Sequence, residues 1–388
     1  MEAPLNKSSA TFGFCVCCAG MMALALGINL LPVFFTTLQA TMGLSNEQLG
    51  RISAVTFLGV VPAILFTGPL ADRFGTRIFA LLGNALIVVG LLMLASAHTY
   101  LAVLMASFVL GVGAGTVDMV LSPIVGALKP ENRSSAMNTL HSFYCTGSMV
   151  AVLVGAATLK LGISWQKAAL VLVTLPVLVF AGVLCMRIPT MGHESVAGGK
   201  QRFRDLIRIP YFQAALLAIA LGGATEMGMA AWLPAYAEKT LGYSAFVGAL
   251  AFTGFLGAMA AGRIGAGFLS NTSNIMKVML ACCIGSVIFF LLASFAPSSP
   301  LALTACILAG LAGSCLWPSM LAVTADRFPR GGATMFGALA AAGNLGCIVM
   351  PWLVGIVSDH SSMRLGIATG ALCPLVMAMV LLKMKKWG

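Results

Sequence analysis

Apolar residues recur along the chain in twelve long runs that alternate with short polar or basic segments. The runs are centred near Leu26, Val60, Leu86, Leu110, Val150, Thr174, Ala224, Phe255, Ile284, Leu311, Asn344 and Cys373. Each run can supply the roughly 20 residues that a membrane-spanning helix needs. The pattern therefore predicts an all-α membrane protein with twelve transmembrane helices, and twelve spans put both termini on the same side of the membrane.

One longer polar and basic segment interrupts this pattern at residues 188–210, and it is too short to form a domain. We interpret it as a cytoplasmic linker with one amphipathic turn, at residues 203–209, lying on the lipid surface. The linker divides the chain into two six-span halves, residues 1–187 and residues 211–388.

The two halves show weak internal repetition. Residues 68–77 close the second run, and a degenerate version at residues 262–271 closes the eighth, 194 positions later. Pro123 of the fourth run matches Pro318 of the tenth at an offset of 195. Parallel repeats of this kind are a transporter architecture, in which the binding site lies between the halves near the middle of the membrane.

Composition and charge agree with a membrane protein. The chain is 60% hydrophobic and 9% charged, whereas soluble domains contain about 25% charged residues. If the N-terminus is placed inside, 17 of the 22 lysines and arginines fall on the inner side. This asymmetry predicts cytoplasmic termini in a multi-pass protein of the cell inner (plasma) membrane. It also accounts for the net charge of +11 without nucleic acid, because no soluble basic face with interleaved aromatic residues is present.

The 11 cysteines all lie within the apolar runs, where a thiol behaves as a small apolar side chain. The spacing of Cys15, Cys17 and Cys18 is reminiscent of a metal motif, but no histidine or acid lies nearby to complete a site. We expect no disulfide, metal or other cofactor.

Two of the 11 acids, Asp118 and Glu226, lie inside apolar runs, whereas the others fall in loops, termini or run ends. An ionised acid in the middle of a bilayer costs on the order of 3 kcal/mol by insertion scales. Such residues face a bundle interior or a water-filled cavity, where they bind protons, ions or substrate. We predict that both acids take part in proton coupling; the alternative is a structural acid that braces neighbouring helices.

Polar side chains also share one face of the fifth run, where Asn138, His141 and Cys145 are spaced three and four residues apart. Histidine changes charge between pH 5 and 8, so His141 can join a proton relay or bind a sugar hydroxyl group. The alternative role is a hydrogen bond between two helices.

Aromatic residues supply a further candidate surface. Trp232 and Tyr236 are four residues apart on the seventh run and therefore share a face of the predicted helix. Trp317 lies beside Pro318 on the tenth run. Sugar rings present apolar C–H faces, so we predict that these three residues bind substrate. The alternative is an aromatic belt at the membrane interface, as expected for Trp352 and Trp387.

Residues 68–77, with the sequence GPLADRFGTR, resemble the signature loop between the second and third spans of the major facilitator superfamily. Twelve spans, a central cytoplasmic loop and cytoplasmic termini agree with that family over the whole chain. The resemblance implies a charge-relay gate that closes the cytoplasmic side, formed here by Asp72, Arg73 and Arg77. Otherwise the two arginines serve only as topology charges.

A finer resemblance is to the fucose permease-like branch of proton-linked sugar symporters. It is carried by residues 113–118, 137–143 and 226–236. This branch has an acid in its fourth span and an asparagine near the start of its fifth, which implies site roles for Asp118 and Asn138. It also has an acid before a Leu-Leu-Pro sequence in the first span, where this chain has Asn29. Asn29 is therefore a predicted substrate ligand without a titrating group.

Phosphate-loop, nucleophile-elbow and zinc-protease motifs are absent from the sequence, so we do not expect an enzyme or an ATP-driven pump. The sequence favours a monomeric secondary active transporter in the lipid bilayer that couples uptake of a small polar solute to protons, and the resemblance implies that this solute is a sugar. A proton-coupled exporter of drugs or metabolites and a non-transporting membrane receptor are the alternatives.

Overall fold

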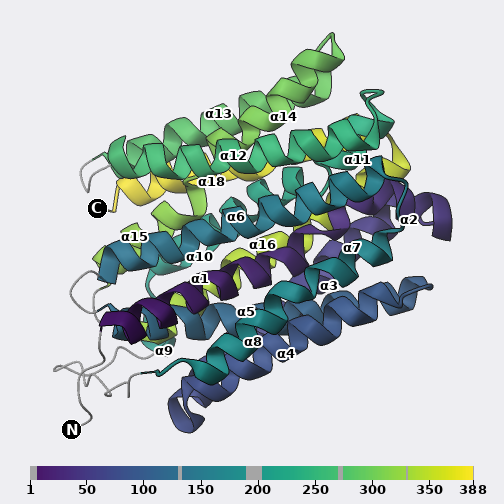
Figure 1. The fold of residues 1–388 in the computed structure, drawn as a ribbon. Helices are drawn as coiled ribbons and strands as arrows, with labels where there is room; N and C mark the ends of the chain where they lie inside the picture. Colours follow the sequence, from purple (N-terminus) through teal and green to yellow (C-terminus); the bar gives the residue numbers. More distant parts are fainter. Residues whose placement is uncertain (1–6, 130–132, 189–202, 270–273, 329–330, 388) are drawn as a thin grey trace, which may run out of the picture. The chain divides into compact units, whose positions relative to one another are not determined.

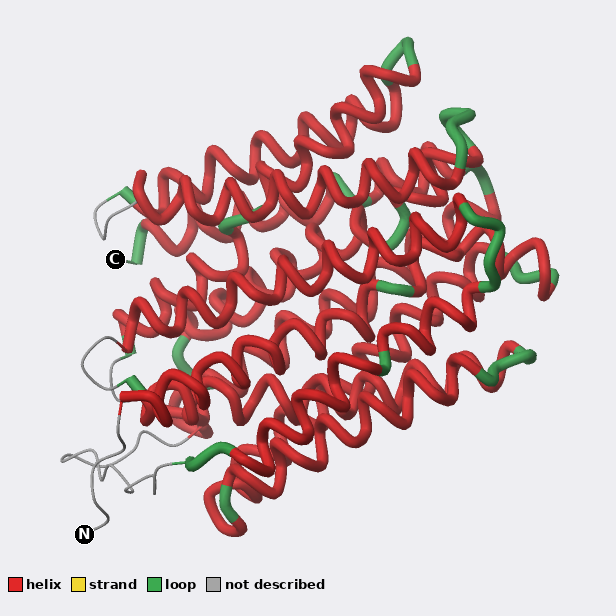
Figure 2. Tube along the Cα trace, in the orientation of Figure 1, coloured by secondary structure: helices red, strands yellow, loops and turns green. Residues whose placement is uncertain are grey.

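Helices form nearly all of the computed structural model, which describes residues 7–129, 133–188, 203–269, 274–328 and 331–387. Within these residues there is no strand (Figure 2). Twelve helical stretches of the described chain are long and apolar enough to cross a membrane. Every predicted run centre falls within one of them, so the prediction of a twelve-helix, all-α membrane protein is confirmed.

The helices before the predicted linker are α1 (Lys7–Asn29), the 3-10 helix η1 (Leu31–Phe34), α2 (Phe35–Met42), α3 (Asn46–Phe74), α4 (Thr76–Ala95), α5 (Tyr100–Leu128), α6 (Arg133–Lys160), α7 (Trp165–Leu172) and α8 (Thr174–Cys185). Those after it are α9 (Phe203–Leu206), α10 (Pro210–Ala230), α11 (Leu233–Lys239), α12 (Ala245–Leu269), α13 (Ile275–Phe295), α14 (Ser299–Gly313), α15 (Leu316–Arg327), α16 (Gly332–His360), α17 (Met363–Thr369) and α18 (Leu372–Lys385).

Several spans consist of two shorter helices, and four of these interruptions precede a proline. The prolines lie in the first turn of the second helix and are Pro176, Pro234, Pro318 and Pro374. Proline has no N–H, so it cannot donate to the carbonyl four residues earlier, and its ring clashes with that carbonyl. By contrast, Pro123 and Pro351 lie inside the continuous helices α5 and α16.

The chain folds into two compact units whose boundaries differ from the two halves of the sequence. Unit 1 comprises Met1–Leu31 and Leu58–Ser195, and unit 2 comprises Pro32–Phe57 and Val196–Gly388. Residues 32–57, which precede the linker, thus pack with unit 2. The predicted linker falls largely outside the described residues, and the boundaries of the two halves stay a prediction.

In unit 1, glycines bring α5 close to its neighbours. A Cβ atom on Gly113 would lie 2.8 Å from the backbone nitrogen of Ile87 in α4, and one on Gly115 would lie 2.6 Å from the Val60 carbonyl oxygen in α3. Small residues allow membrane helices to approach in this way. The glycines before Asp118 therefore let the helix that carries this acid pack closely against α3 and α4.

In unit 2, α10 packs along α16 (Figure 1). The contact is again made through glycines, because a Cβ atom on Gly346 would lie 1.9 Å from the Ala220 carbonyl oxygen. Large apolar side chains remain exposed on both units, among them Phe66 and Leu178 of unit 1 and Ile264 and Phe295 of unit 2. An apolar surface on helices of this length is suited to lipid rather than to water.

Candidate functional site

The signature loop ends α3 and begins α4, and its glycine at position 75 makes the turn possible. Gly75 alone joins the two helices, with φ of 90°. A side chain is strained in this region of backbone space, whereas glycine is not. Asp72, Arg73 and Arg77 are all exposed. Arg77 donates a hydrogen bond to the Leu184 carbonyl oxygen in the last turn of α8, which satisfies a helix-end acceptor. The gate role of the three charges stays a prediction.

Asn29 lies at the end of α1 and is nearly fully buried, with 3% of its surface exposed. Its amide nitrogen donates to Ser148 Oγ at 2.9 Å and lies 3.4 Å from Tyr144 Oη, both on α6. Ser148 in turn donates to the Tyr144 carbonyl oxygen at 2.9 Å. Asn29 thus anchors a neutral polar cluster between two helices of unit 1.

Asp118 is partly buried on α5, and His141 is exposed on α6. The two side chains interact electrostatically. Unit 1 thus places the predicted proton carrier near the predicted relay histidine. Asn138 is part of α6, but its side chain lies outside the described residues.

Glu226 of unit 2 is paired rather than isolated. Its Oε2 accepts a hydrogen bond from a guanidinium nitrogen of Arg263 on α12 at 3.0 Å. The two side chains are 16% and 26% exposed, respectively. Arg263 also lies 3.7 Å from the Met259 sulfur atom. An acid and a base therefore meet in the partly buried interior of unit 2.

A helix interruption holds this ion pair in place. Arg263 Nε donates to the Ser314 carbonyl oxygen at 3.3 Å, and Ser314 follows the last residue of α14. In a continuous helix this carbonyl would accept from residue 318, but Pro318 has no N–H. The proline therefore leaves an acceptor free, and the guanidinium group occupies it.

The predicted aromatic ligands lie in the core of unit 2. Trp232 precedes α11 and, like Tyr236, is fully buried. Trp232 Nε1 donates to the Pro351 carbonyl oxygen at 2.9 Å, and Tyr236 Oη donates to the Ala293 carbonyl oxygen at 2.6 Å. Trp232 is the N-cap of α11, and the Tyr236 backbone nitrogen donates to its carbonyl oxygen at 2.8 Å, so the two residues are one helical turn apart.

Trp317 is partly buried against the glycines that join α10 to α16. A Cβ atom on Gly343 would lie 2.2 Å from its ring, and one on Gly223 would lie 2.9 Å from it. The ring thus fills the space that two absent side chains leave. Substrate binding by Trp232, Tyr236 and Trp317 stays a prediction, with each side chain engaged in packing in this structure.

Sequence reasoning missed Arg263, Tyr144 and Ser148. Arg263 is one of the 17 basic residues that the charge distribution assigns to the inner side, although the span Ala245–Ala266 contains it. An arginine in a span is as costly as an acid and carries the same functional implication. Tyr144 and Ser148 follow His141 at helical spacing, which was the available signal for a polar face.

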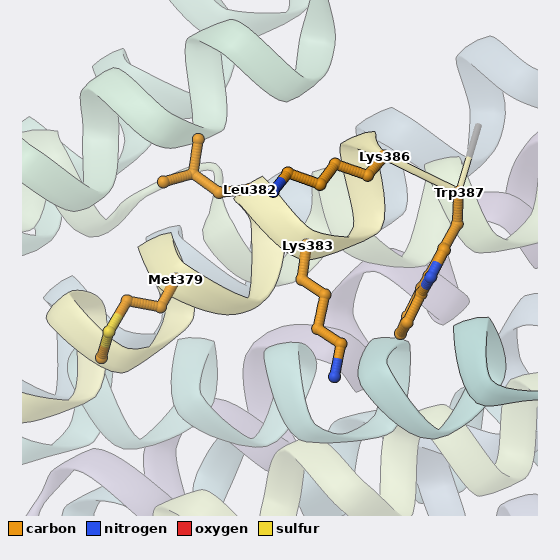
Figure 3. Close-up of a pocket in the computed structure, with 5 residues that line it drawn as sticks. All are labelled: Met379, Leu382, Lys383, Lys386 and Trp387. Carbon is orange, nitrogen blue, oxygen red and sulfur yellow. The ribbon is translucent and has the colours of Figure 1, made fainter.

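A surface pocket lies at the end of α18, lined by Met379, Leu382, Lys383, Lys386 and Trp387 (Figure 3). Lys383 Nζ lies 5.3 Å from the centroid of the Trp387 ring. Lysines and tryptophan beside apolar residues at a helix end are typical of a membrane interface. None of the predicted site residues lines this pocket.

Relatives with similar sequences include a Bacillus subtilis (strain 168) protein, NiaP, whose name describes it as a niacin/nicotinamide transporter. It is 27% identical over 350 residues, covering 86% of this chain and 85% of the relative. The gentisate transporter of Corynebacterium glutamicum is 26% identical over 384 residues, covering 91% and 84%. The multidrug resistance protein MdtL of Shewanella oneidensis is 26% identical over 220 residues, covering 55% of each chain.

Solved structures show the same fold over nearly the whole chain. A bacterial homologue of the human lysosomal transporter Spinster has a TM-score of 0.82 at 15% identity, covering 98% of both chains. The Escherichia coli fucose:proton symporter FucP has a TM-score of 0.68 at 19% identity, covering 97% of this chain and 99% of the symporter. The family model of the Major Facilitator Superfamily matches residues 16–285 and 247–386. The chain is therefore a membrane transporter of the major facilitator superfamily.

Proposed function

We propose that the protein is a proton-coupled secondary transporter that takes up a small organic acid by alternating access. The observation that carries this proposal is the Glu226–Arg263 ion pair in the interior of unit 2. A guanidinium group binds carboxylates through parallel hydrogen bonds. Two relatives matched along most of their length are named for niacin/nicotinamide and for gentisate. Niacin and gentisate are carboxylic acids on an aromatic ring, and nicotinamide is the neutral amide of niacin.

The ion pair also offers a route to coupling. A substrate carboxylate that binds Arg263 displaces the Glu226 carboxylate from it. Glu226 then takes up a proton, because an unpaired carboxylate in the membrane interior is costly. Release of the substrate restores the ion pair and expels the proton. Asp118, with His141 in its field, is the second candidate proton carrier.

A sugar is the second candidate substrate. The cluster of Asn29, Tyr144 and Ser148 supports it, because neutral amide and hydroxyl groups suit sugar hydroxyl groups. In this alternative Asn138 adds a polar ligand and Trp232, Tyr236 and Trp317 add an aromatic surface. The fold shared with the fucose:proton symporter agrees with it.

We place both termini in the cytoplasm of the cell inner (plasma) membrane, as the distribution of basic residues favours. With this orientation the signature loop lies on the cytoplasmic side, where Asp72, Arg73 and Arg77 would act as the gate. The end of α16 and the start of α3 then lie on the outer side. We propose that the monomer is the transporting form.

Purified protein in proteoliposomes with an imposed pH gradient tests the function. We expect labelled nicotinate or gentisate to accumulate, and Arg263→Gln to reduce accumulation by about tenfold or more, as loss of a charged hydrogen-bond partner predicts. Arg364→Gln is the matched control, because Arg364 also donates to a backbone carbonyl, that of Ser294, at 3.1 Å. Asp118→Asn should abolish accumulation but retain part of the exchange.

The other outcomes discriminate between functions. Accumulation of fucose without either acid would favour the sugar symporter. Proton-driven efflux of drugs without uptake of organic acids or sugars would favour an exporter. The partial match with the multidrug resistance protein MdtL agrees with that alternative. Binding without flux would identify a receptor. Accumulation of organic acids by Arg263→Gln at the level of the unaltered protein would contradict the role of the ion pair.

A further inference from the structure

Residues 32–57, here termed the hairpin segment, pack within unit 2 although the chain continues from them into unit 1. The segment contains α2 and the first part of α3, which runs without interruption across the boundary at residues 57 and 58. Its contacts with α11 and α16 are therefore contacts that a motion of unit 1 would strain or break.

Asp359, in the last turn of α16, caps the N-terminus of α3. Its two carboxylate oxygens accept hydrogen bonds from the backbone nitrogens of Asn46 at 2.9 Å and Glu47 at 2.7 Å. The first N–H groups of a helix have no partner within that helix and carry a partial positive charge. A carboxylate from 312 residues away in the chain thus provides both the hydrogen bonds and the complementary charge.

Glu47 makes the second polar link. Its side chain accepts a hydrogen bond from Trp352 Nε1 on α16 at 2.5 Å and pairs with Arg51 on its own helix. Between the two links the backbones touch. A Cβ atom on Gly50 would lie 2.4 Å from the Pro351 carbonyl oxygen, and one on Gly355 would lie 2.4 Å from that of Asn46.

An apolar contact completes the docking of the hairpin segment. Phe35 of α2 packs edge-on against Trp232, with ring centroids 5.5 Å apart. Both rings are fully buried. Asp359 and Trp352, in contrast, are exposed, and Glu47 is partly exposed. Water can therefore replace each of these polar hydrogen bonds when it breaks. The free energy required to break them is small for that reason.

We infer that Asp359, together with the Glu47–Trp352 hydrogen bond, is the clasp that holds the outer side of the transporter closed. Alternating access requires the hairpin segment, which is continuous with unit 1, to leave α16 when the outer side opens. Asp359 then acts as a positioning residue that sets the ratio of closed to open molecules. The inference rests on the proposed orientation and not on the identity of the substrate.

Distances between spin labels test the clasp. Labels at Thr41→Cys in the hairpin segment and Ser361→Cys beyond α16 occupy exposed positions, in a background with Cys15→Ala and Cys185→Ala because both cysteines are exposed. In nanodiscs without substrate, Asp359→Ala should raise the ratio of long to short distances by roughly tenfold, as the loss of a charged helix cap predicts. Trp352→Phe should shift it in the same direction by less.

Matched variants separate the clasp from general destabilisation. Asp326→Ala removes an exposed acid from the end of α15, and Trp387→Phe alters the exposed tryptophan after α18. Both should leave the distances unchanged. If Asp359→Ala folds poorly, Trp352→Phe provides the same readout. An unchanged distance distribution in a folded Asp359→Ala or Trp352→Phe protein would overturn the inference, whereas a wrong substrate assignment would leave the measurement unaffected.

Discussion

Glu226 and Arg263 show how a single charged residue in a membrane span finds its partner. The acid alone suggests a proton carrier, whereas the arginine beside it in space is the basis of our proposal that the pair also binds an anion. Either charge would be costly to bury without the other, because an isolated charge in an apolar interior loses its hydration without compensation. Asp118 has no such bonded partner among the described residues, which keeps it the simpler candidate for proton transfer.

A double-mutant cycle measures this pairing. Glu226→Gln and Arg263→Gln should each lower the unfolding temperature, because each leaves the other charge unpaired. The double variant should recover part of the loss. We expect a coupling free energy of about 1–2 kcal/mol, below the roughly 3–5 kcal/mol for breaking a fully buried pair, because both side chains are partly exposed. Additive effects in thermal unfolding would show that the pair contributes no coupling.

At the scale of helices, prolines and glycines determine the site. Pro318 frees the Ser314 carbonyl oxygen for Arg263, and glycines allow α10 and α16 to cross closely enough for Trp317 to lie against both. These prolines and glycines can be identified from the sequence alone. The sequence does not predict which of its 43 glycines lie at a contact between helices. Many glycine positions within a span cannot be distinguished until the neighbouring helix is known.

A pair of glycines on one helix tests this conclusion. Gly346→Ala places a methyl group against the Ala220 carbonyl oxygen, whereas a Cβ atom on Gly337 meets nothing within 4 Å. We expect Gly346→Ala to destabilise unit 2 by about 1–3 kcal/mol through overpacking, and Gly337→Ala to be neutral or slightly stabilising. Thermal unfolding in detergent gives the comparison. Equal unfolding temperatures for the two variants would contradict the tight crossing.

For the whole molecule, the distribution of basic residues predicts the orientation in the membrane. We expect a green fluorescent protein fused to the C-terminus to be fluorescent and an alkaline phosphatase fused there to be inactive, because the proposed orientation places both termini in the cytoplasm. A phosphatase fused into the loop that follows α16 should be active, and this serves as the control. The reverse result would place the clasp at Asp359 on the inner side and the signature loop on the outer side.

The prediction of the fold succeeded at the level where one physical requirement dominates. A span in lipid must satisfy its own backbone hydrogen bonds, so a run of about 20 apolar residues becomes a helix almost regardless of which apolar residues it contains. The signature loop at residues 68–77 then identified the family, which the family model confirms. Individual helix interruptions were less predictable: Pro318 follows one, whereas Pro123, its counterpart in the repeat, lies inside a continuous helix.

The sequence by itself determined the number of spans, the family and the two acids that needed an explanation, because apolar length and buried charge are local properties of the chain. Only the tertiary structure decided that Arg263 pairs with Glu226, that Trp232 and Tyr236 bond to backbone carbonyls, and that Asp359 caps α3. Each of these contacts joins residues that are 37 to 313 positions apart in the chain. Their geometry depends on how helices pack, and neither hydropathy nor residue spacing encodes that packing.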